Sequence, residues 1–275
     1  MKNFVVPVDF TESSIQTALI AAELASTTRQ GRLILYNVFE STAAGVDGTP
    51  LADDSTARRT ITEMAFENLK TRLHSQQPSL DIAYYEEQGS SLAANLEKFV
   101  QRQQSDFIVI GVSEGSDIEN FLMGSHAIDI TKRNVCPVII IPPNARYKGV
   151  QNILFASDFK DVRNTTPTQA IRGVLSAFDS RLHVVHLYQT GEEQPADLQQ
   201  AKAELIEMLV DFRPEFHVLD ETDFIGTIGR LVQEQNIDMI LTVPRTHSFF
   251  SNLFSTGRTR KLAYQSPVPV IAVHE

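Results

Sequence analysis

The sequence predicts an α/β protein made of two similar halves, each with a mainly parallel sheet and helices on both faces. Three observations lead to this fold class. Short continuous apolar runs indicate strands that are buried on both faces. Segments with apolar residues at helical spacing lie between those runs. The whole pattern then occurs a second time along the chain.

The internal repeat is visible in four pairs of segments that follow the same order in each half. Two pairs are related by an offset of 149 residues, and they are 3–10 (NFVVPVDF) with 152–159 (NILFASDF), and 32–39 with 181–188. Two later pairs are related by an offset of 132, and they are 106–110 with 238–242, and 136–141 with 268–273. The first half therefore has the longer connection, which we assign to the loop-like residues 41–56.

The repeat predicts two domains, residues 1–143 and 150–275. The boundary falls at Pro142-Pro143-Asn144-Ala145-Arg146, because consecutive prolines end a strand and begin a linker.

The elements of the first half follow the order β-α-β-α-β-α-β-α-β. Strands are expected at about 3–8, 32–38, 80–85, 106–111 and 137–142, and the weak run at 80–85 predicts a strand nearer an edge. Three apolar stripes predict helices, and they comprise Ile15, Ala18, Leu19, Ala22 and Ala25; Ile61, Met64, Ala65 and Leu69; and Leu92, Leu96, Phe99 and Val100. Such alternation implies a parallel sheet with right-handed crossovers.

The second half repeats this arrangement. Thr166-Pro167 predicts a helix start with proline at the first position. Two further helices are predicted by apolar stripes, and these comprise Leu198, Ala201, Leu205, Met208 and Leu209, and Phe224, Ile228, Leu231 and Val232.

Composition excludes several classes of function. The net charge of -10 argues against nucleic acid as the main partner, because affinity for the phosphate backbone needs dense Lys and Arg. The single Cys136 excludes an intrachain disulfide. No apolar run reaches membrane-spanning length, and the N-terminus does not look like a signal sequence, so we expect a soluble cytoplasmic protein without membrane association.

The chain resembles tandem proteins of the universal stress protein family. The resemblance rests on VPVDFTESS at 6–14, YNVFE at 36–40, the loop from Gly111 to Ser125, and CPVIII at 136–141, in the family's order. It implies two tandem Rossmann-like domains of the adenine nucleotide α-hydrolase type, each with a five-stranded parallel sheet. Nucleotide-binding members carry Gly-x2-Gly-x9-Gly-Ser/Thr, a pattern that brings backbone and a helix N-terminus to the phosphates.

The resemblance implies an adenine nucleotide site in the first half. Asp9, with Pro7 and Val8 beside it, would contact the adenosine end, and Val38 would contact the base through its backbone. The phosphate side would be lined by Gly111, Ser113, Gly124, Ser125 and His126. From the residues alone, Asp9 could equally cap the first helix, and Gly124-Ser125 could be an ordinary helix N-cap.

The phosphate loop departs from the family pattern in both halves. In the first half Glu114 occupies the middle glycine position, where a carboxylate would repel phosphate unless it turned away or met a cation such as Mg²⁺. Gly115 lies one residue late. In the second half Val243 and Thr246 replace glycines and Thr256-Gly257 replaces Gly-Ser, so ATP binding there is not expected.

Other chemistry finds little support. His183 and His186 are three apart on a predicted strand, so they should point to opposite faces and cannot share a metal, and the remaining histidines are scattered in sequence. No metal site, nucleophile or catalytic base is assigned.

Three functions stay open. The first is a non-catalytic stress-response regulator that binds ATP or another adenine nucleotide, with slow hydrolysis at most. The second is a ligand-free interaction module that uses the aromatic loops at Phe121 and Phe249-Phe250. The third, a hydrolase or nucleotidyl transferase, ranks lowest. By resemblance, the last strands of the two halves would pair as an intrachain pseudo-dimer, and homodimers could form.

Overall fold

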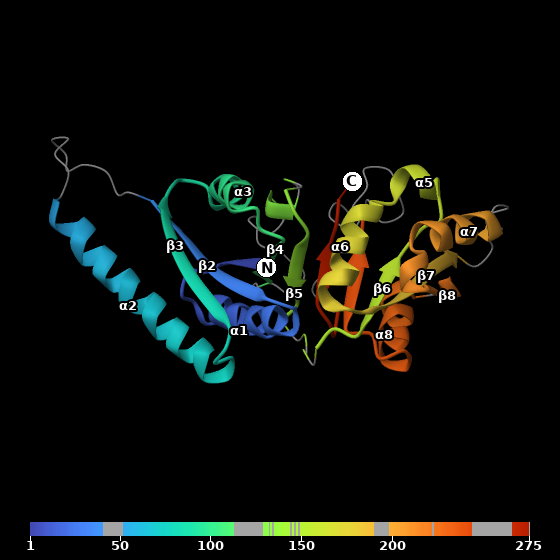
Figure 1. Ribbon diagram of the computed structural model, residues 1–275, viewed down its shortest axis with the longest axis horizontal. Coiled ribbons are helices and arrows are strands. Elements are labelled where there is room, and N and C mark those ends of the chain that lie inside the picture. Colours follow the sequence, from blue (N-terminus) through green and yellow to red (C-terminus); the bar gives the residue numbers. More distant parts are fainter. Residues whose placement is uncertain are drawn as a thin grey trace. The chain divides into compact units, whose positions relative to one another are not determined.

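A computed structural model describes residues 1–40, 52–112, 129–131, 133, 135–143, 145, 147, 149–189, 198–221, 223–243 and 266–274. Their packing divides the chain into two compact units, Met1–Val109 and Ile110–Glu275. The α/β architecture predicted from the sequence is confirmed: the strands form a mostly parallel sheet, with helices between them (Figure 1). None of the helices in the described part of the chain is long and apolar enough to span a membrane.

The first unit contains three helices and the first four strands. Its elements are β1 (Lys2–Pro7), α1 (Glu12–Thr27), β2 (Gly31–Phe39), α2 (Ala52–Gln76), β3 (Asp81–Gln88), α3 (Leu92–Gln103) and β4 (Phe107–Gly111), whose last residues continue into the second unit. The strand order is β3-β2-β1-β4, and the pairs β1–β2, β2–β3 and β1–β4 are all parallel. The expected weak strand, β3, stands at the edge of this order, as predicted.

Helices cover both faces of the first unit's sheet. Helix α1 packs on β1 and β2 and also contacts α2, whereas α3 lies on the opposite side (Figure 1). Thr11 caps α1 by accepting a 3.3 Å hydrogen bond from the Ser14 amide, and Ser91 caps α3 in the same way. Aromatic contacts join α3 to the sheet, since the rings of Tyr36 and Phe99 lie 4.5 Å apart.

The buried face of α2 is only partly the one that the apolar spacing predicts. Leu69 is buried as predicted, but Ile61 and Met64 are more than half exposed, and Phe66 and Leu73 are buried in their place. The helix turns these aromatic and leucine side chains inward because Phe66 stacks on Tyr84 of β3 at 4.5 Å.

The second unit repeats the same order of strands. Its elements are β5 (Val138–Ile141), β6 (Asn152–Ala156), α5 (Val162–Thr165), α6 (Thr168–Phe178), β7 (Arg181–Gln189), α7 (Leu198–Met208), a 3₁₀ helix (Val210–Phe212), β8 (Glu215–Glu221), α8 (Phe224–Glu234), β9 (Met239–Thr242) and β10 (Val270–Ala272). The order is β5-β10-β9-β6-β7-β8, in which only β5–β10 is antiparallel. The strands β8-β7-β6-β9 repeat the order β3-β2-β1-β4 of the first unit.

One helix start differs from its prediction. Pro167 is the N-cap of α6 rather than its first helical residue, and it follows Thr166, the C-cap of the short helix α5.

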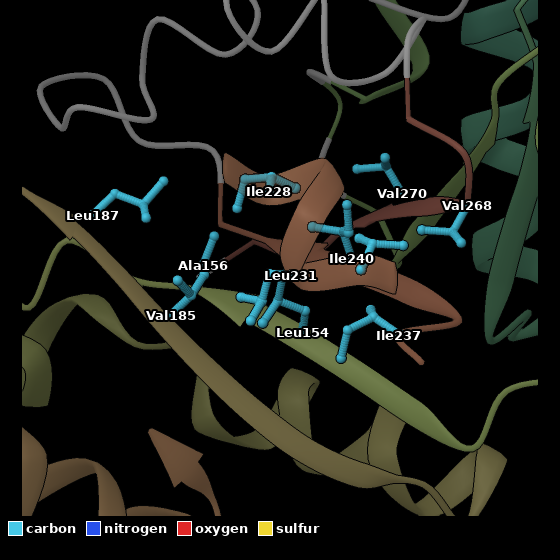
Figure 2. Close-up of a cluster of buried hydrophobic side chains, with 11 residues drawn as sticks. Leu154, Ala156, Val185, Leu187, Ile228, Leu231, Ile237, Ile240, Val268 and Val270 are labelled. Carbon is cyan, nitrogen blue, oxygen red and sulfur yellow. The ribbon is translucent and has the colours of Figure 1, made fainter. Parts of the chain in front are cut away.

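Helix α8 covers one face of the second unit's sheet. Ile228 and Leu231 of α8 pack against Leu154 of β6, Val185 of β7 and Ile240 of β9 (Figure 2). All five side chains are at least 96% buried. The apolar stripe predicted from the sequence is therefore the face that builds this core.

Left-handed backbone positions recur at the offsets of the sequence repeat. Phe10 (φ 62°) corresponds to Phe159 (φ 55°) at an offset of 149 residues. Gln104 (φ 49°) corresponds to Asn236 (φ 50°) at an offset of 132. Because non-glycine residues seldom adopt this conformation, the coincidence shows that the two halves share their turns as well as their strands.

Candidate functional site

The exit of the chain from β1 is fixed by two hydrogen bonds to β2. The Val8 amide donates to the Tyr36 carbonyl at 2.8 Å, and the Val8 carbonyl accepts from Asn37 Nδ2 at 2.7 Å. Val8 itself is buried, and Pro7 is the last residue of β1. The side chain of Asn37 thus takes a position that a backbone amide would fill in a continuing ladder.

The backbone of Val38 faces the space beyond the end of β1. Along a parallel strand, successive residues direct their N–H and C=O groups to alternate neighbours. The Tyr36 carbonyl bonds to the β1 side and the Phe39 carbonyl accepts from Gly89 on the β3 side at 3.0 Å. Val38 therefore directs its polar backbone groups to the β1 side, past the last residue of that strand.

Asp9 is held at the surface by the start of α1. Its Oδ1 accepts from the Thr11 hydroxyl at 2.6 Å and from the Thr11 amide at 3.1 Å. Burial by itself would raise the pKa of the Asp9 carboxyl, but hydrogen bonds from Thr11 and Ser14 outweigh it and lower the pKa below 3.8. Asp9 is therefore a fixed, exposed and ionised acceptor.

The residue after Asp9, Phe10, adopts a left-handed backbone conformation with φ 62°. The Phe10 ring meets Phe66 of α2 edge-to-face at 5.0 Å. Asp9 is exposed, and Asn37 and Val38 are half-buried.

The second half has the same backbone plan at the end of β6. The Ser157 amide donates to the Val185 carbonyl at 3.0 Å, and His186 Nδ1 lies 3.1 Å from the Ser157 carbonyl. Ser157 and His186 correspond to Val8 and Asn37 at the offset of 149.

The corresponding edge of the second half is nevertheless covered. Phe159 is buried and stacks on His186, with the ring centroids 4.8 Å apart and an interplanar angle of 9°. Asp158, the counterpart of Asp9, is only 7% exposed, and Leu187, the counterpart of Val38, is likewise buried. Val243, which stands in the place of Gly111, is also buried. The two halves therefore differ in how far the residues at this sheet edge are exposed to solvent.

The structure brings together part of the predicted site. Pro7, Val8, Asp9 and Val38 gather at the carboxyl ends of β1 and β2. Gly111 ends β4, which runs parallel to β1 in a register that pairs Phe4 with Phe107. The remaining predicted residues lie outside the described residues, and these are Ser113, Gly124, Ser125 and His126, together with the loop residue Glu114.

Sequence reasoning missed two features. Asn37 holds the end of β1 and Thr11 holds Asp9. Thr11 directly follows the Asp-Phe motif, whereas no signal along the chain pointed to Asn37 of β2. The interpretation of the histidines as scattered is wrong, because His183 Nδ1 lies 3.1 Å from His217 Nε2. The pairing of β7 with β8 brings them together, and this register cannot be read from spacing along the chain.

Comparisons with known proteins agree with this fold. A model of the universal stress protein family matches residues 1–142. A universal stress protein from Archaeoglobus fulgidus is 14% identical with a TM-score of 0.70, over 99% of this chain and 98% of that chain. A putative universal stress protein from Pseudomonas aeruginosa is 12% identical with a TM-score of 0.57, over 100% of this chain and 93% of that chain.

The same fold also occurs in another setting. The cytoplasmic domain of a prokaryotic cation chloride cotransporter is 10% identical with a TM-score of 0.54, over 98% of this chain and 94% of that chain. No curated protein sequence gives a significant match. The family model covers more than half of the chain, so the chain belongs to the universal stress protein family.

Proposed function

We propose that this chain is a cytoplasmic, non-catalytic regulator of the stress response that binds an adenine nucleotide in residues 1–143. The observation that carries the proposal is the contrast between two equivalent carboxylates. Asp9 is exposed and ionised at the same sheet edge as Val38, whereas the equivalent Asp158 is only 7% exposed. The two halves therefore hold one exposed and one buried copy of the same carboxylate.

The chemistry of the open site suits a nucleoside. An ionised carboxylate that two groups of Thr11 hold in place can accept hydrogen bonds from ribose hydroxyls without further ordering cost. The N–H and C=O of Val38 offer a donor and an acceptor to the edge of a base. Ligands of open α/β sheets bind at the carboxyl ends of the strands, where these groups lie.

The phosphates would extend toward Gly111 and the loop that carries Ser113, Gly124, Ser125 and His126. Mg²⁺ would accompany a triphosphate through the phosphate oxygens. Glu114 should weaken this interaction, so Glu114→Gly is expected to tighten ATP binding and to leave adenosine binding unchanged. Equal affinity of ATP for both proteins would contradict this pose.

The experiment that tests the proposal uses purified full-length chain without added nucleotide. Denaturation should release an adenine nucleotide, or the empty protein should bind ATP, AMP or cAMP in equilibrium dialysis. If it releases none and binds none of the three, the proposal fails.

The second half, residues 150–275, favours a different role. Asp158, Leu187 and Val243 at its equivalent edge are buried, so we propose that this half is a ligand-free domain that serves association. The antiparallel pair β5–β10, which joins the last strand of each repeat, supports the intrachain part of this idea. Sedimentation of the purified chain with and without ATP would show whether homodimers form and whether nucleotide shifts them.

A further inference from the structure

A cluster of two histidines and one glutamate lies at the amino ends of β7 and β8. The register pairs His183 with Glu215 and Val185 with His217. Because side chains two residues apart share a face of a sheet, Glu215 and His217 lie on one face, and His183 joins them there. The candidate nucleotide site lies at the opposite, carboxyl ends of the strands, so this cluster is independent of it.

We propose that His183, Glu215 and His217 form a site for a divalent transition metal ion of the zinc type. One ligand atom from each residue lies within 4.8 Å of the others. His183 Nδ1 and His217 Nε2 are 3.1 Å apart. His183 Nδ1 lies 3.9 Å from Oε2 of Glu215, and His217 Nε2 lies 3.9 Å from its Oε1. A tetrahedral zinc ion with its usual bond lengths separates its ligand atoms by about 3.3 Å. Small side-chain rotations would therefore bring all three atoms to bonding distance.

The burial of the cluster suits a site that is formed before the metal arrives. The side chains of His183 and His217 are 8% and 12% exposed, so packing restricts their orientation. The Glu215 side chain is 63% exposed and gives the metal an entry from solvent. Two imidazoles and one carboxylate are the ligand set of zinc sites that leave a fourth position to water or substrate.

A pocket of about 420 Å³ adjoins the cluster and is lined by His183 and Glu215 together with Arg181 and Arg213. These two guanidinium groups repel a cation, so we expect the affinity for Zn²⁺ to be below that of structural zinc sites. They would also favour an anion as the fourth ligand, since a metal ion and two arginines together attract negative charge.

The fold does not require these residues. The matching positions of the first half, at the offsets of 149 and 132, are Ile34, Ala83 and Tyr85. These residues occupy equivalent places in β2 and β3, where Ile34 pairs with Ala83. The same strand pair is therefore built without any metal ligand in one half and with three in the other.

The test is a Zn²⁺ titration of the full-length chain, prepared without a histidine tag and stripped of metal with a chelator. We expect one equivalent to bind, with affinity at least tenfold weaker in Glu215→Gln and weaker still in His217→Ala. His74→Gln, which removes a histidine of α2 far from the cluster in sequence, should bind Zn²⁺ normally. Co²⁺ in place of Zn²⁺ should give the visible absorption of a four-coordinate ion.

Circular dichroism and the melting temperature establish that each variant is folded. If His217→Ala does not fold, the exposed Glu215→Gln substitution decides the question, because it leaves the buried histidines in place. Absence of saturable Zn²⁺ binding would overturn the proposal. Equal Zn²⁺ affinity in the wild-type chain and Glu215→Gln would overturn it too, because the metal would then be bound elsewhere.

Discussion

Phe159 provides a sharp prediction, because at this position glycine should be a better replacement than alanine. Phe159 is 5% exposed, and its ring centroid lies 4.8 Å from that of His186 and 6.2 Å from that of Phe216. Removing a buried phenylalanine side chain costs about 3–5 kcal/mol of unfolding free energy. We therefore expect Phe159→Ala to lie in that range.

The backbone at Phe159 reverses the usual order of alanine and glycine. Its φ of 55° is left-handed, a conformation that costs a residue with a Cβ about 1–2 kcal/mol and glycine almost nothing. Phe159→Gly loses the same ring but relieves this strain. It should therefore be about 1 kcal/mol more stable than Phe159→Ala, although glycine normally destabilises.

Urea unfolding of the two variants measures the difference, and the hydrogen exchange of β7 amides reports on the affected region. The order of the two variants is the test, and it does not depend on whether the whole chain unfolds in one step. If Phe159→Ala is as stable as Phe159→Gly or more stable, the left-handed conformation of Phe159 at the end of β6 is wrong.

Two further predictions concern stability. Phe66→Ala should lower the free energy of unfolding by about 3–5 kcal/mol, because the ring is 1% exposed and stacks on Tyr84. Met64→Ala, at a position that is 61% exposed, should change it by less than about 0.5 kcal/mol. Equal effects of the two substitutions in urea unfolding would contradict the orientation of α2. Burial lowers the pKa of His274 below its usual 6.5, so as pH falls the unfolded chain is protonated first and stability is lost below about pH 6.5. The loss between pH 7.5 and 5.5 should be smaller in His274→Asn, and an identical pH dependence would show that His274 does not cause it.

The fold could be predicted from the sequence because a parallel sheet covered on both faces leaves a strong signal. Strands such as Val138–Ile141 are continuous apolar runs, and the repeat doubles the evidence for each of them. The apolar face of α2 was harder to predict. Ile61 and Met64 suit a helical stripe as well as Phe66 and Leu73 do, and the contact of Phe66 with Tyr84 decides between the two faces.

The sequence could predict only those features of the candidate site that depend on residues near one another along the chain. Asp9 stands at the end of a recognisable strand, so its place at the sheet edge follows from local sequence. Whether that edge is open depends on the neighbouring side chains. Asp9 and Asp158 sit in the same motif, yet Asp9 is exposed and Asp158 is buried. The meeting of His183 with His217 likewise depends on the β7–β8 register, which hydrophobic patterns do not specify.

The central claim is that the first half holds an open nucleotide site and the second half a closed copy of it. Calorimetric titration of ATP into the full-length chain, Asp9→Asn and Asp158→Asn tests it most directly, because the two variants make the same chemical change at equivalent positions. We predict that ATP binds the wild-type chain and Asp158→Asn alike, and that Asp9→Asn weakens binding at least tenfold. Undiminished affinity in Asp9→Asn, or a loss confined to Asp158→Asn, would contradict the account.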